Sequence, residues 1–483
     1  MERRLISLSE HCGYVVQITE LHPHSNADRL QIATIFGASV IVDLNVKIDD
    51  LGIYFPIDLQ LSEEYCRENN LVRKKNENGE NVGGYLDPDK RNIRAMKLRG
   101  EQSEGLFMPL ESLKYTGETK FEVGNKIDVI NGHEICRKYI PKGNAHTSGP
   151  RNGNHTRKRS VPIAPLFAEH ADTEQLVYHL NDIKEDDLIE ITLKMHGTSG
   201  RTGYLPKFQG YKRTLWDKIR RRPGTPIYDW GYVTGTRRVV LNDFEDGGFY
   251  GSNAFREPHA KFFEGKLNKG ETVYYEIVGF TTDGAPIMAS VANSKISDKE
   301  FTKQYGKETV FSYGCDPKGT PAMINGAGET VCEASPQSTC YVYRMTMTNE
   351  DGDVVEYTPD FMRYRCEQMG AKCVPVMWKG IIPENEKDRS DGLWYQRGQP
   401  NQWLNLRSPG EWIKEKAEEY YDGPDPIGKT HVREGVVIRI VNRPKFCAYK
   451  HKNWSFKVLE GIAKDLAAEP DMEEAQDVIE SDS

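Results

Sequence analysis

The feature that most constrains the fold of this chain is a short β-type run that delivers a lysine to a glycine turn. Residues 191–200 read ITLKMHGTSG, with Lys194 at the end of the apolar and β-branched part. Strand residues on both sides would fix the stem of Lys194, and Gly197, which has no Cβ, would let the backbone approach a phosphate closely. A lysine whose pKa is lowered by burial or by a nearby cation can act as a covalent nucleophile. The motif alone is weak, so the prediction depends on charged partners further along the chain.

The composition is that of a globular protein of two to four domains. The chain has 483 residues, of which 37% are hydrophobic and 28% are charged. No apolar run is long enough to span a bilayer, and residues 1–5 lack a signal-peptide core, so we expect a cytoplasmic protein, in the host cytoplasm if the source is viral. Nine cysteines without a C-x-x-C pair argue against a zinc ribbon and against a disulfide framework.

The N-terminal region is predicted to be β-rich. Strands at 15–18, 32–35 and 39–42 are separated by turns that contain Asn, Asp and Gly, a spacing that suits a small barrel. The segment HPHSNADRL at 22–30 resembles the tRNA-binding OB domain attached to some phenylalanyl-tRNA synthetases. Such a barrel can carry single-stranded nucleic acid, or it can serve only to pack against the next domain. Residues 97–106 are predicted to form a polar loop that closes the barrel or touches RNA.

Changes in composition divide the chain into four segments. We expect an OB-like domain over 1–137 and a basic, flexible linker over 138–160 that is rich in Gly, Asn, His and Pro. A second domain follows over 161–462, and its long β segments with interspersed helices predict an α+β fold. The acidic tail at 463–483 is expected to end in disorder. The net charge of −8 does not favour nucleic-acid binding, but basic clusters at 157–159, 220–222 and 237–238 can bind phosphate locally.

Several elements can be predicted inside the second domain. Helix-capping patterns predict helices that end at Gly306, at Gly370 and near Tyr421, opened by the sequences at 297–300, 358–359 and 408–411. Residues 212–223 are predicted as a basic loop, and 310–335 as an insertion that contains glycine. Strands are predicted at 231–240 (as strand, turn, strand), 273–280, 340–345, 434–441 and 446–458.

Charged residues suited to phosphate chemistry follow Lys194 in the sequence. An attack on a phosphate needs cations around its oxygens and hard carboxylate ligands for a divalent metal. Glu276 is the only acid of an apolar strand, and Glu434 opens a β-branched strand; a buried carboxylate is costly unless it is paired or bound to a metal or a hydroxyl. Lys450 and Lys452 would point to the same side of a strand, where they could hold a triphosphate.

Tyr343 could stack on a nucleobase. Each of these residues also has an ordinary explanation on its own: Glu276 as an ion-pair partner, Lys450 and Lys452 on a solvated sheet edge, and Tyr343 as a core aromatic. Their joint occurrence in one order favours the functional interpretation.

In this order the residues resemble the motifs of the ATP-dependent RNA ligases, within the covalent nucleotidyltransferase superfamily of ligases and capping enzymes. The lysine motif is KMHGT at 194–198, in which His196 stands where DNA ligases usually carry Asp, as in nick-sealing phage ligases and kinetoplastid editing ligases. An OB-like region before the core is similar to Deinococcus-type RNA ligases. The resemblance implies an α+β nucleotidyltransferase core (an ATP-grasp-like ligase adenylation domain) of antiparallel sheets with helices. The other matching motif residues are Arg237, Glu276, Tyr343, Glu434, Lys450 and Lys452, with Phe456 following.

The resemblance also implies an activity: the ATP-dependent joining of RNA 3′-hydroxyl and 5′-phosphate ends through a lysyl-AMP intermediate, with Mg²⁺ or Mn²⁺, in RNA repair. Glu276 and Glu434 would hold the metal or a ribose hydroxyl. The substrate could be a nicked duplex, a tRNA or other RNA ends, and the oligomeric state is open. The implied catalytic residues are Lys194, Glu276, Glu434, Lys450 and Lys452, and ATP binding would add His196, Gly197, Arg237 and Tyr343.

Many relatives carry Glu directly before the lysine, where this chain has Leu193, so adenine recognition is unassigned and Glu190 or Thr192 could contribute. A capping guanylyltransferase or a DNA ligase shares the lysine chemistry, but both usually need a further OB domain. The roughly thirty residues after Lys452 are too few for one. The other alternative is an inactive protein that binds RNA ends, against which the retention of the charged residues speaks.

Overall fold

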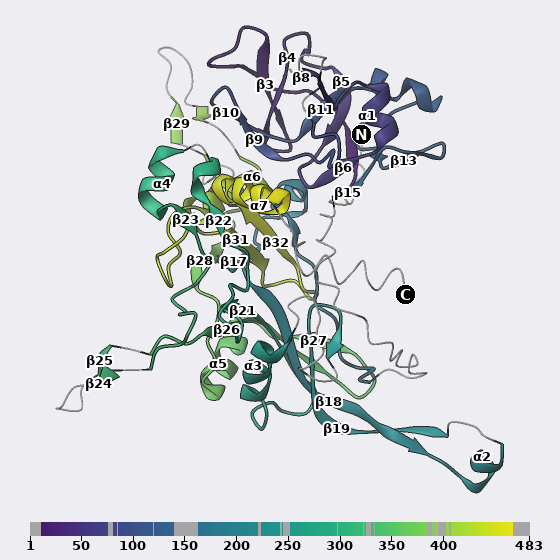
Figure 1. Ribbon diagram of the computed structural model, residues 1–483, viewed down its shortest axis with the longest axis vertical. Coiled ribbons are helices and arrows are strands. Elements are labelled where there is room, and N and C mark those ends of the chain that lie inside the picture. The colour runs from purple at the N-terminus through teal and green to yellow at the C-terminus, as the bar shows by residue number, and fades with distance from the viewer. Residues whose placement is uncertain are drawn as a thin grey trace.

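The computed structural model describes most of the chain between residues 11 and 466. An N-terminal domain forms one end of an elongated molecule, and a larger domain built on two sheets forms the rest (Figure 1). Apart from residues 138 and 139, the expected linker lies outside the described residues, and so does the acidic tail beyond 466. The described ranges are 11–75, 81–84, 86–118, 120–139, 163–220, 224–241, 244, 252–296, 298–321, 323–324, 330–332, 334–384, 389–390, 392–394, 402–404 and 407–466.

The N-terminal domain is a set of small antiparallel sheets around two apolar cores. One core contains Phe55, Leu59 and Tyr65, and the other contains Tyr14 and Val40. The main sheet has the order β11-β5-β1-β12, and a second has the order β2-β3-β4, which confirms the three predicted strands. The strands are β1 (Gly13–Gln17), β2 (Leu21–Pro23), β3 (Leu30–Ile35), β4 (Ala38–Asp43), β5 (Leu51–Phe55), β6 (Leu59–Leu61), β7 (Arg73–Lys75), β8 (Asn81–Gly83), β11 (Leu106–Pro109), β12 (Lys126–Ile127), β13 (Val129–Ile130), β14 (His133–Glu134) and β15 (Cys136–Lys138), with helix α1 (Glu63–Glu68).

The prediction of a loop over 97–106 is wrong. This segment forms most of a hairpin in which β9 (Ala95–Leu98) pairs with β10 (Glu101–Glu104). Arg99 and Gly100 form the two-residue turn and both have positive φ, 50° and 100°. Two positive φ values in a two-residue connection match the twist of paired strands. The prediction failed because the segment is mostly polar and lacks the alternation of apolar and polar residues by which strands are recognised.

The second domain holds two sheets, joined by the lysine motif. The first has the order β16-β32-β31-β17-β28 and the second β20-β19-β18-β21-β26-β27. All of their pairings are antiparallel except that of β16 with β32. The chain crosses from one sheet to the other between Lys194 and Thr198, which confirms the predicted α+β core of antiparallel sheets. The strands are β16 (Glu174–Gln175), β17 (Leu188–Lys194), β18 (Thr198–Lys212), β19 (Thr225–Gly235), β20 (Val240–Leu241), β21 (Glu271–Gly279), β26 (Ser338–Thr348), β27 (Val354–Glu356), β28 (Val376–Ile381), β31 (Gly435–Ile440) and β32 (Ala448–Lys452).

Helices α5 and α6 begin and end at the residues that their capping patterns predict, whereas α4 is capped by Asp298, one residue after the Ser297 that opens the predicted capping box. Helix α5 (Pro359–Met369) is capped by Thr358 and ends at Gly370, which has a left-handed backbone. Helix α6 (Pro409–Tyr421) has a complete capping box of Ser408 and Glu411. Helix α4 (Lys299–Tyr305) ends at Gly306 as predicted, with Asp298 as its cap. Capping side chains satisfy backbone amides that the first helical turn leaves unbonded.

The predicted strand over 446–458 is wrong in its second half. Strand β32 ends at Lys452, and helix α7 (Trp454–Leu466) follows. The side chain of Asn453 accepts a hydrogen bond from the backbone N–H of Phe456 at 2.7 Å, as an N-cap does. The predicted basic loop also contains a short helix, α2 (Leu215–Ile219). The other elements are α3 (Glu257–Phe262), β22 (Val291–Ala292), β23 (Glu308–Thr309), β24 (Met323–Ile324), β25 (Thr330–Cys332), β29 (Gly392–Trp394) and β30 (Gln402–Leu404).

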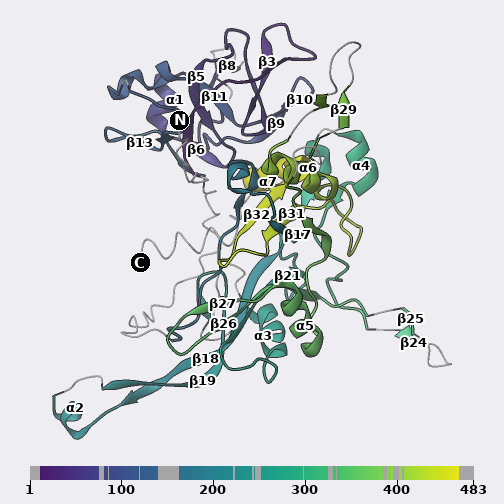
Figure 2. The same cartoon turned by 180° about the vertical axis from the view of Figure 1, so that it is seen from behind.

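The two domains are in contact beside the first sheet. Helix α7 lies between that sheet and the N-terminal domain in both ribbon views (Figures 1 and 2). Lys457 on this helix forms an ion pair of 2.5 Å with Glu104 of β10. Tyr178 of the second domain packs its ring against Phe36 and Tyr14, with centroids 5.8 and 6.2 Å apart. The N-terminal domain is therefore held against the end of the sheet that carries the lysine motif.

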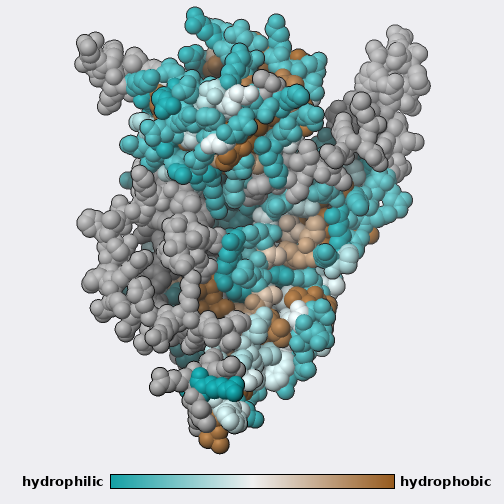
Figure 3. All heavy atoms as spheres, turned by 90° about the vertical axis from the view of Figure 1, so that its right-hand side faces the viewer, coloured by the Kyte–Doolittle hydropathy of each residue, from teal (hydrophilic) through white to brown (hydrophobic). Residues whose placement is uncertain are grey.

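The surface is mostly polar, as expected for a chain with 28% charged residues. The face in Figure 3 is mostly hydrophilic, with small separate apolar patches. Within the described part of the chain, no helix combines the length and the apolar character that crossing a bilayer requires. Eight of the nine cysteines are free thiols in the structure.

Candidate active site

One cavity of about 630 Å³ opens where the two sheets and the N-terminal domain meet. Its walls include residues from both sheets, from helix α7 and from the N-terminal domain, among them Tyr54 and Glu104. The structure thus brings together predicted site residues that lie as far apart in the sequence as Lys194 and Lys452. The nine residues predicted from the sequence to form the site all line this cavity: Lys194, His196, Gly197, Arg237, Glu276, Tyr343, Glu434, Lys450 and Lys452.

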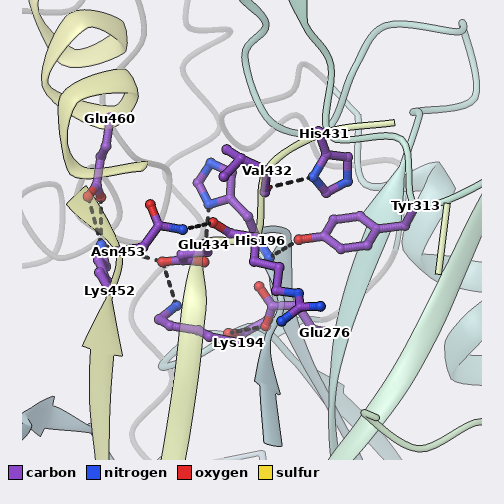
Figure 4. Close-up of polar contacts among 12 residues, drawn as sticks. Lys194, His196, Glu276, Tyr313, His431, Val432, Glu434, Lys452, Asn453 and Glu460 are labelled. Atoms are coloured by element: carbon purple, nitrogen blue, oxygen red, sulfur yellow. Dashed lines mark hydrogen bonds and ion pairs between the residues drawn. The ribbon is translucent and has the colours of Figure 1, made fainter. Parts of the chain in front are cut away.

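Lys194 is placed by the pairing of two central strands. It is the last residue of β17 and lies opposite Gly435, the first residue of β31, so the preceding Glu434 stands beside it. The Lys194 Nζ atom is 2.8 Å from Glu434 Oε1 (Figure 4). The lysine side chain is 22% exposed, whereas that of Glu434 is only 2% exposed. The amine therefore reaches the cavity while its counter-ion stays in the protein interior.

Glu434 is the buried anion at the centre of a cationic cluster. Lys452 Nζ lies 3.4 Å from Glu434 Oε1 and also forms an ion pair of 2.7 Å with Glu460 on α7. Burial alone would raise the pKa of the Glu434 carboxyl, but the charges of Lys194 and Lys452 outweigh it and lower the pKa to about 2. Glu434 is therefore ionised at neutral pH and orients both lysines.

This carboxyl gives the stability of the protein a specific acid dependence. Because folding lowers the Glu434 pKa from 4.5 to about 2, the folded state is favoured above pH 4.5, and this contribution is lost as the pH falls toward 2. At 1.36 kcal/mol per unit, the contribution is about 3 kcal/mol. We expect Glu434→Gln to remove this part of the acid sensitivity, measured as the difference in urea unfolding free energy between pH 5 and pH 3. An unchanged difference would contradict the assignment.

His196, two residues after Lys194, is fixed by contacts from the loop that contains Phe311 and Tyr313 and from helix α7. The backbone N–H of His196 donates to Tyr313 Oη at 2.7 Å, and its ring packs edge-on against Phe311 and Phe456 with centroids 4.6 and 4.8 Å away. The ring nitrogen Nδ1 is 3.6 Å from Glu434 Oε2. His196 is thus held on three sides and points toward the same carboxylate as the two lysines.

Gly197 is needed because the loop touches strand β21. A Cβ at this position would lie 2.3 Å from the carbonyl oxygen of Ile277 and 2.8 Å from a methyl group of Val278. Atoms this close must shift. The glycine expected from the sequence thus has a packing reason in the structure, in addition to any approach to a phosphate.

We expect Gly197→Ala to destabilise the protein by about 1–3 kcal/mol, the usual cost of forcing extra atoms into a packed site. Urea unfolding measures the change. Gly461→Ala in helix α7 is the matched control: a Cβ there meets no atom within 4 Å, so this variant should gain roughly 0.5–1 kcal/mol because alanine favours helices. Equal effects of the two substitutions would contradict this account of Gly197.

Glu276 lies across the cavity on β21. Its Oε2 atom accepts a hydrogen bond from Ser199 Oγ at 3.3 Å. The start of β18 is in turn fixed by the buried Arg256, which donates to the Ser199 carbonyl oxygen at 2.8 Å and to Thr198 Oγ1 at 2.6 Å. The carboxylate of Glu276 therefore belongs to a rigid wall that faces the lysine from the second sheet.

The remaining predicted residues, Arg237, Tyr343 and Lys450, also line the cavity. Arg237 forms an ion pair of 2.5 Å with Asp172, and Arg238 reaches the same carboxylate at 3.4 Å. The two arginines lower the pKa of Asp172 although its partial burial acts to raise it. The hydroxyl of Tyr343 is 3.5 Å from His170 Nδ1. Lys450 lies on β32 opposite Gln175 and lines the cavity.

The structure also bears on the question of adenine recognition. Both carboxylate oxygens of Glu190 accept hydrogen bonds from Arg363, at 2.9 and 2.7 Å, so this side chain is already engaged by a cation. Thr192 lines the cavity on the same strand as Lys194. Glu190 lines the same cavity, so both residues considered for base contact face it.

Sequence reasoning missed several residues of the site. Tyr313 belongs to the segment taken for an insertion, and Asp172 and Glu460 lie outside every recognised motif. No local sequence signal distinguishes these residues. Their roles arise from long-range contacts: Tyr313 with the backbone of His196, Asp172 with Arg237, and Glu460 with Lys452.

The residues present are compatible with a divalent cation. Among the described residues, no three His, Cys, Asp or Glu side chains are grouped so that they could hold a metal ion. However, Glu434 Oε2 is buried and accepts no hydrogen bond from the described part of the chain, and Glu276 lines the same cavity. Mg²⁺ is usually held by one or two carboxylates together with waters and substrate phosphates. Glu434 and Glu276 therefore fit a cation whose other ligands arrive with a nucleotide.

Comparisons with known proteins agree with this architecture. A family model described as an OB-fold domain matches residues 13–110, which confirms the nature of the N-terminal domain. No curated protein matches the chain. The chain therefore has an OB-fold domain followed by an α+β core of two antiparallel sheets.

Solved structures share the fold of nearly the whole chain. The chain is similar to the RNA ligase of Naegleria gruberi: to an arginine mutant with ATP and Mn at 17% identity and a TM-score of 0.53, covering 96% of this chain and 100% of that one. A lysine mutant with AMP and Mn has 14% identity and a TM-score of 0.51, covering 92% and 97%. An aspartate mutant without ligand has 16% identity and a TM-score of 0.51, covering 92% and 96%. The likeness is one of fold, and it confirms at that level the resemblance to RNA ligases predicted from the motifs.

Proposed function

We propose that the protein is an ATP-dependent RNA ligase that joins RNA 3′-hydroxyl and 5′-phosphate ends through a lysyl-AMP intermediate, in RNA repair. The observation that carries this proposal is the amine of Lys194, held 2.8 Å from the buried Glu434 at the wall of a 630 Å³ cavity. The nucleophile, its counter-ion and additional cations face one space large enough for a nucleotide. The fold shared with an RNA ligase supports the same conclusion.

The proposed reaction has three steps. Lys194 Nζ attacks the α-phosphorus of ATP, so that a phosphorus–nitrogen bond forms and pyrophosphate leaves. The AMP group then passes to the 5′-phosphate of RNA, which frees the lysine. Finally the RNA 3′-hydroxyl attacks that activated phosphate, a phosphodiester forms and AMP departs. Each step is a displacement at phosphorus, in which catalysis consists of positioning and of stabilising charge.

The residues around the cavity suit these roles. Because the pKa of Glu434 is about 2, this carboxylate is a poor acceptor for the lysine proton; its proposed role is to orient the amine of Lys194. Lys450 and Lys452 would stabilise phosphate charge, and Arg237 would turn from Asp172 to a phosphate. Tyr343 would stack on the base, and His196 would lie near the α-phosphate.

A divalent cation, Mg²⁺ or Mn²⁺, would be held by Glu276 and Glu434. When bound, it would add positive charge beside the phosphate oxygens and disfavour the protonated form of the attacking amine. The protein's own contribution is to fix the two carboxylates on separate sheets that face one cavity.

The proposal is tested by incubating the purified protein with labelled ATP or GTP and a divalent cation, followed by transfer to RNA. We expect a covalent label from ATP only, and loss of that label when RNA with a 5′-phosphate at a nick is added. A label from GTP would instead indicate a capping enzyme, and transfer to nicked DNA alone a DNA ligase. Binding of RNA without any label would indicate an inactive end-binding protein.

A further inference from the structure

The β18–β19 hairpin is far longer than the active site requires. Strand β18 runs for 15 residues from Thr198 to Lys212, and β19 for 11 residues from Thr225 to Gly235. At about 3.3 Å per residue, β18 spans about 50 Å. The hairpin begins at the lysine motif and projects from the body of the molecule, ending at α2 (Figure 1). We call this hairpin, residues 204–220 and 224–232, the ribbon.

One face of the ribbon is aromatic. Residues directly opposite each other on paired strands lie on the same face, so Tyr204 adjoins Tyr232, and Phe208 adjoins Tyr228. Tyr204 and Tyr232, at the base of the ribbon, also pack against the core of the second domain. The ring centroids of these pairs are 4.7 and 5.9 Å apart, and Tyr211 continues the row 5.1 Å from Phe208. At the end of the ribbon Trp216 is 67% exposed, next to Leu215, which is 78% exposed. Apolar atoms are visible at the corresponding lower end of the molecule in Figure 3.

The ribbon is also basic, in a chain whose net charge is −8. Residues 207–220 and 224–232 contain five Lys or Arg and two Asp. Asp217 is occupied in local structure, since its carboxylate accepts from the Thr214 N–H at 2.9 Å and from its hydroxyl at 2.7 Å. The exposed Arg220 lies over the ring of Trp216 at 5.7 Å. The exposed end of the ribbon therefore combines cations with flat aromatic surfaces.

We infer that the ribbon binds an unpaired RNA strand that leads into the active site. Aromatic rings with interspersed cations are the pattern that binds single-stranded nucleic acid, because bases stack on the rings and phosphates meet the cations. In a duplex the bases are already stacked and offer no free faces to these rings. Strand β18, whose outer part belongs to the ribbon, starts four residues after Lys194, so an RNA strand lying along the ribbon would lead toward the cavity. The identity of the strand as RNA rests on the proposed function.

The inference predicts which substitutions weaken RNA binding. Trp216→Ala should raise the Kd for a single-stranded RNA oligonucleotide about fivefold or more, as the loss of one stacked base does. Lys212→Glu with Arg220→Glu should also weaken binding and should reduce the slope of log K against log salt by at least about 1.4, the value for two lost phosphate contacts. The control is Lys303→Glu with Lys307→Glu, which makes the same charge change on exposed residues of α4 and of the turn after it. This control should leave both quantities nearly unchanged.

The experiment measures fluorescence anisotropy of the full chain with a labelled single strand and with a blunt duplex of the same length. The expected result is that the ribbon variants lose affinity for the single strand more than for the duplex, while labelling by ATP is unchanged. Labelling by ATP tests the proposed function separately, so a protein that binds RNA through the ribbon but takes no label would overturn only that function. Equal losses in the control variant, or unchanged affinity in both ribbon variants, would overturn the inference. A dimer that Trp216→Ala dissociates, with RNA binding intact, would also overturn it.

Discussion

The Lys194→Arg variant is expected to form no covalent adduct with ATP, a loss of at least about 10³-fold in the rate of adenylylation. A guanidinium remains protonated at any pH at which the protein is folded, so it has no lone pair with which to attack phosphorus. The substitution keeps the positive charge beside Glu434, and the ion pair can re-form. We therefore expect the free energy of unfolding to change by less than about 1.5 kcal/mol, the usual range for a substitution that conserves volume.

The measurement is the rate at which label from ATP becomes acid-stable on the protein, together with urea unfolding. Lys450→Arg is a matched control because this lysine lines the same cavity and is proposed only to stabilise phosphate charge. Arginine preserves that charge, so Lys450→Arg should retain much of the labelling. If Lys194→Arg labelled at the rate of the unchanged protein, another residue would have to be the nucleophile.

Glu434→Gln is expected to have the second largest effect, a loss of adenylylation on the order of 10²-fold, as for the removal of one preorganised electrostatic contact. The amide is neutral, so the amine of Lys194 loses its counter-ion and its orientation, and Lys452 loses the same partner. Removing one member of a buried ion pair typically costs about 3–5 kcal/mol, because the other charge stays behind without compensation. Activity and unfolding free energy should therefore both fall.

The variant Glu271→Gln separates the effect of Glu434→Gln on adenylylation from its effect on stability. Glu271 is as buried as Glu434, and its carboxylate is bound by Arg365, with Nη2 2.8 Å from Oε2. Glu271 is the first residue of β21, the strand that also carries Glu276, and it does not line the cavity. We expect this variant to lose stability by a similar amount but to keep its rate of labelling below the unfolding temperature. An equal loss of labelling would mean that stability, and not the position of the carboxylate, explains the effect of Glu434→Gln.

The parts of the site that could be predicted are those whose chemistry is concentrated in short motifs. Lys194 ends one β-branched run and Glu434 precedes another, and a single strand pairing then places them side by side. Helix ends were predictable for the same reason: Thr358, Ser408 and Gly370 act through bonds to residues only a few positions away. Local bonds leave a local signature in the sequence.

The parts that could not be predicted depend on contacts between distant segments. Tyr313 is 117 residues from His196 and holds its backbone, and Asp172 is 65 residues from Arg237. Neither belongs to a recognisable pattern. The wrong strand beyond Lys452 has a different cause: a single capping bond from Asn453 starts helix α7 within an apolar stretch that is also compatible with a strand. That helix brings Glu460 to Lys452 and Lys457 to the N-terminal domain.

The most direct test of the account is the site of nucleotide attachment. The protein should be incubated with ATP and magnesium or manganese, digested, and its peptides sequenced by mass spectrometry. The account predicts one AMP group bound through nitrogen to Lys194, and none on Lys450 or Lys452, which line the same cavity. An adduct on either of those lysines, or no adduct on a folded protein, would contradict it.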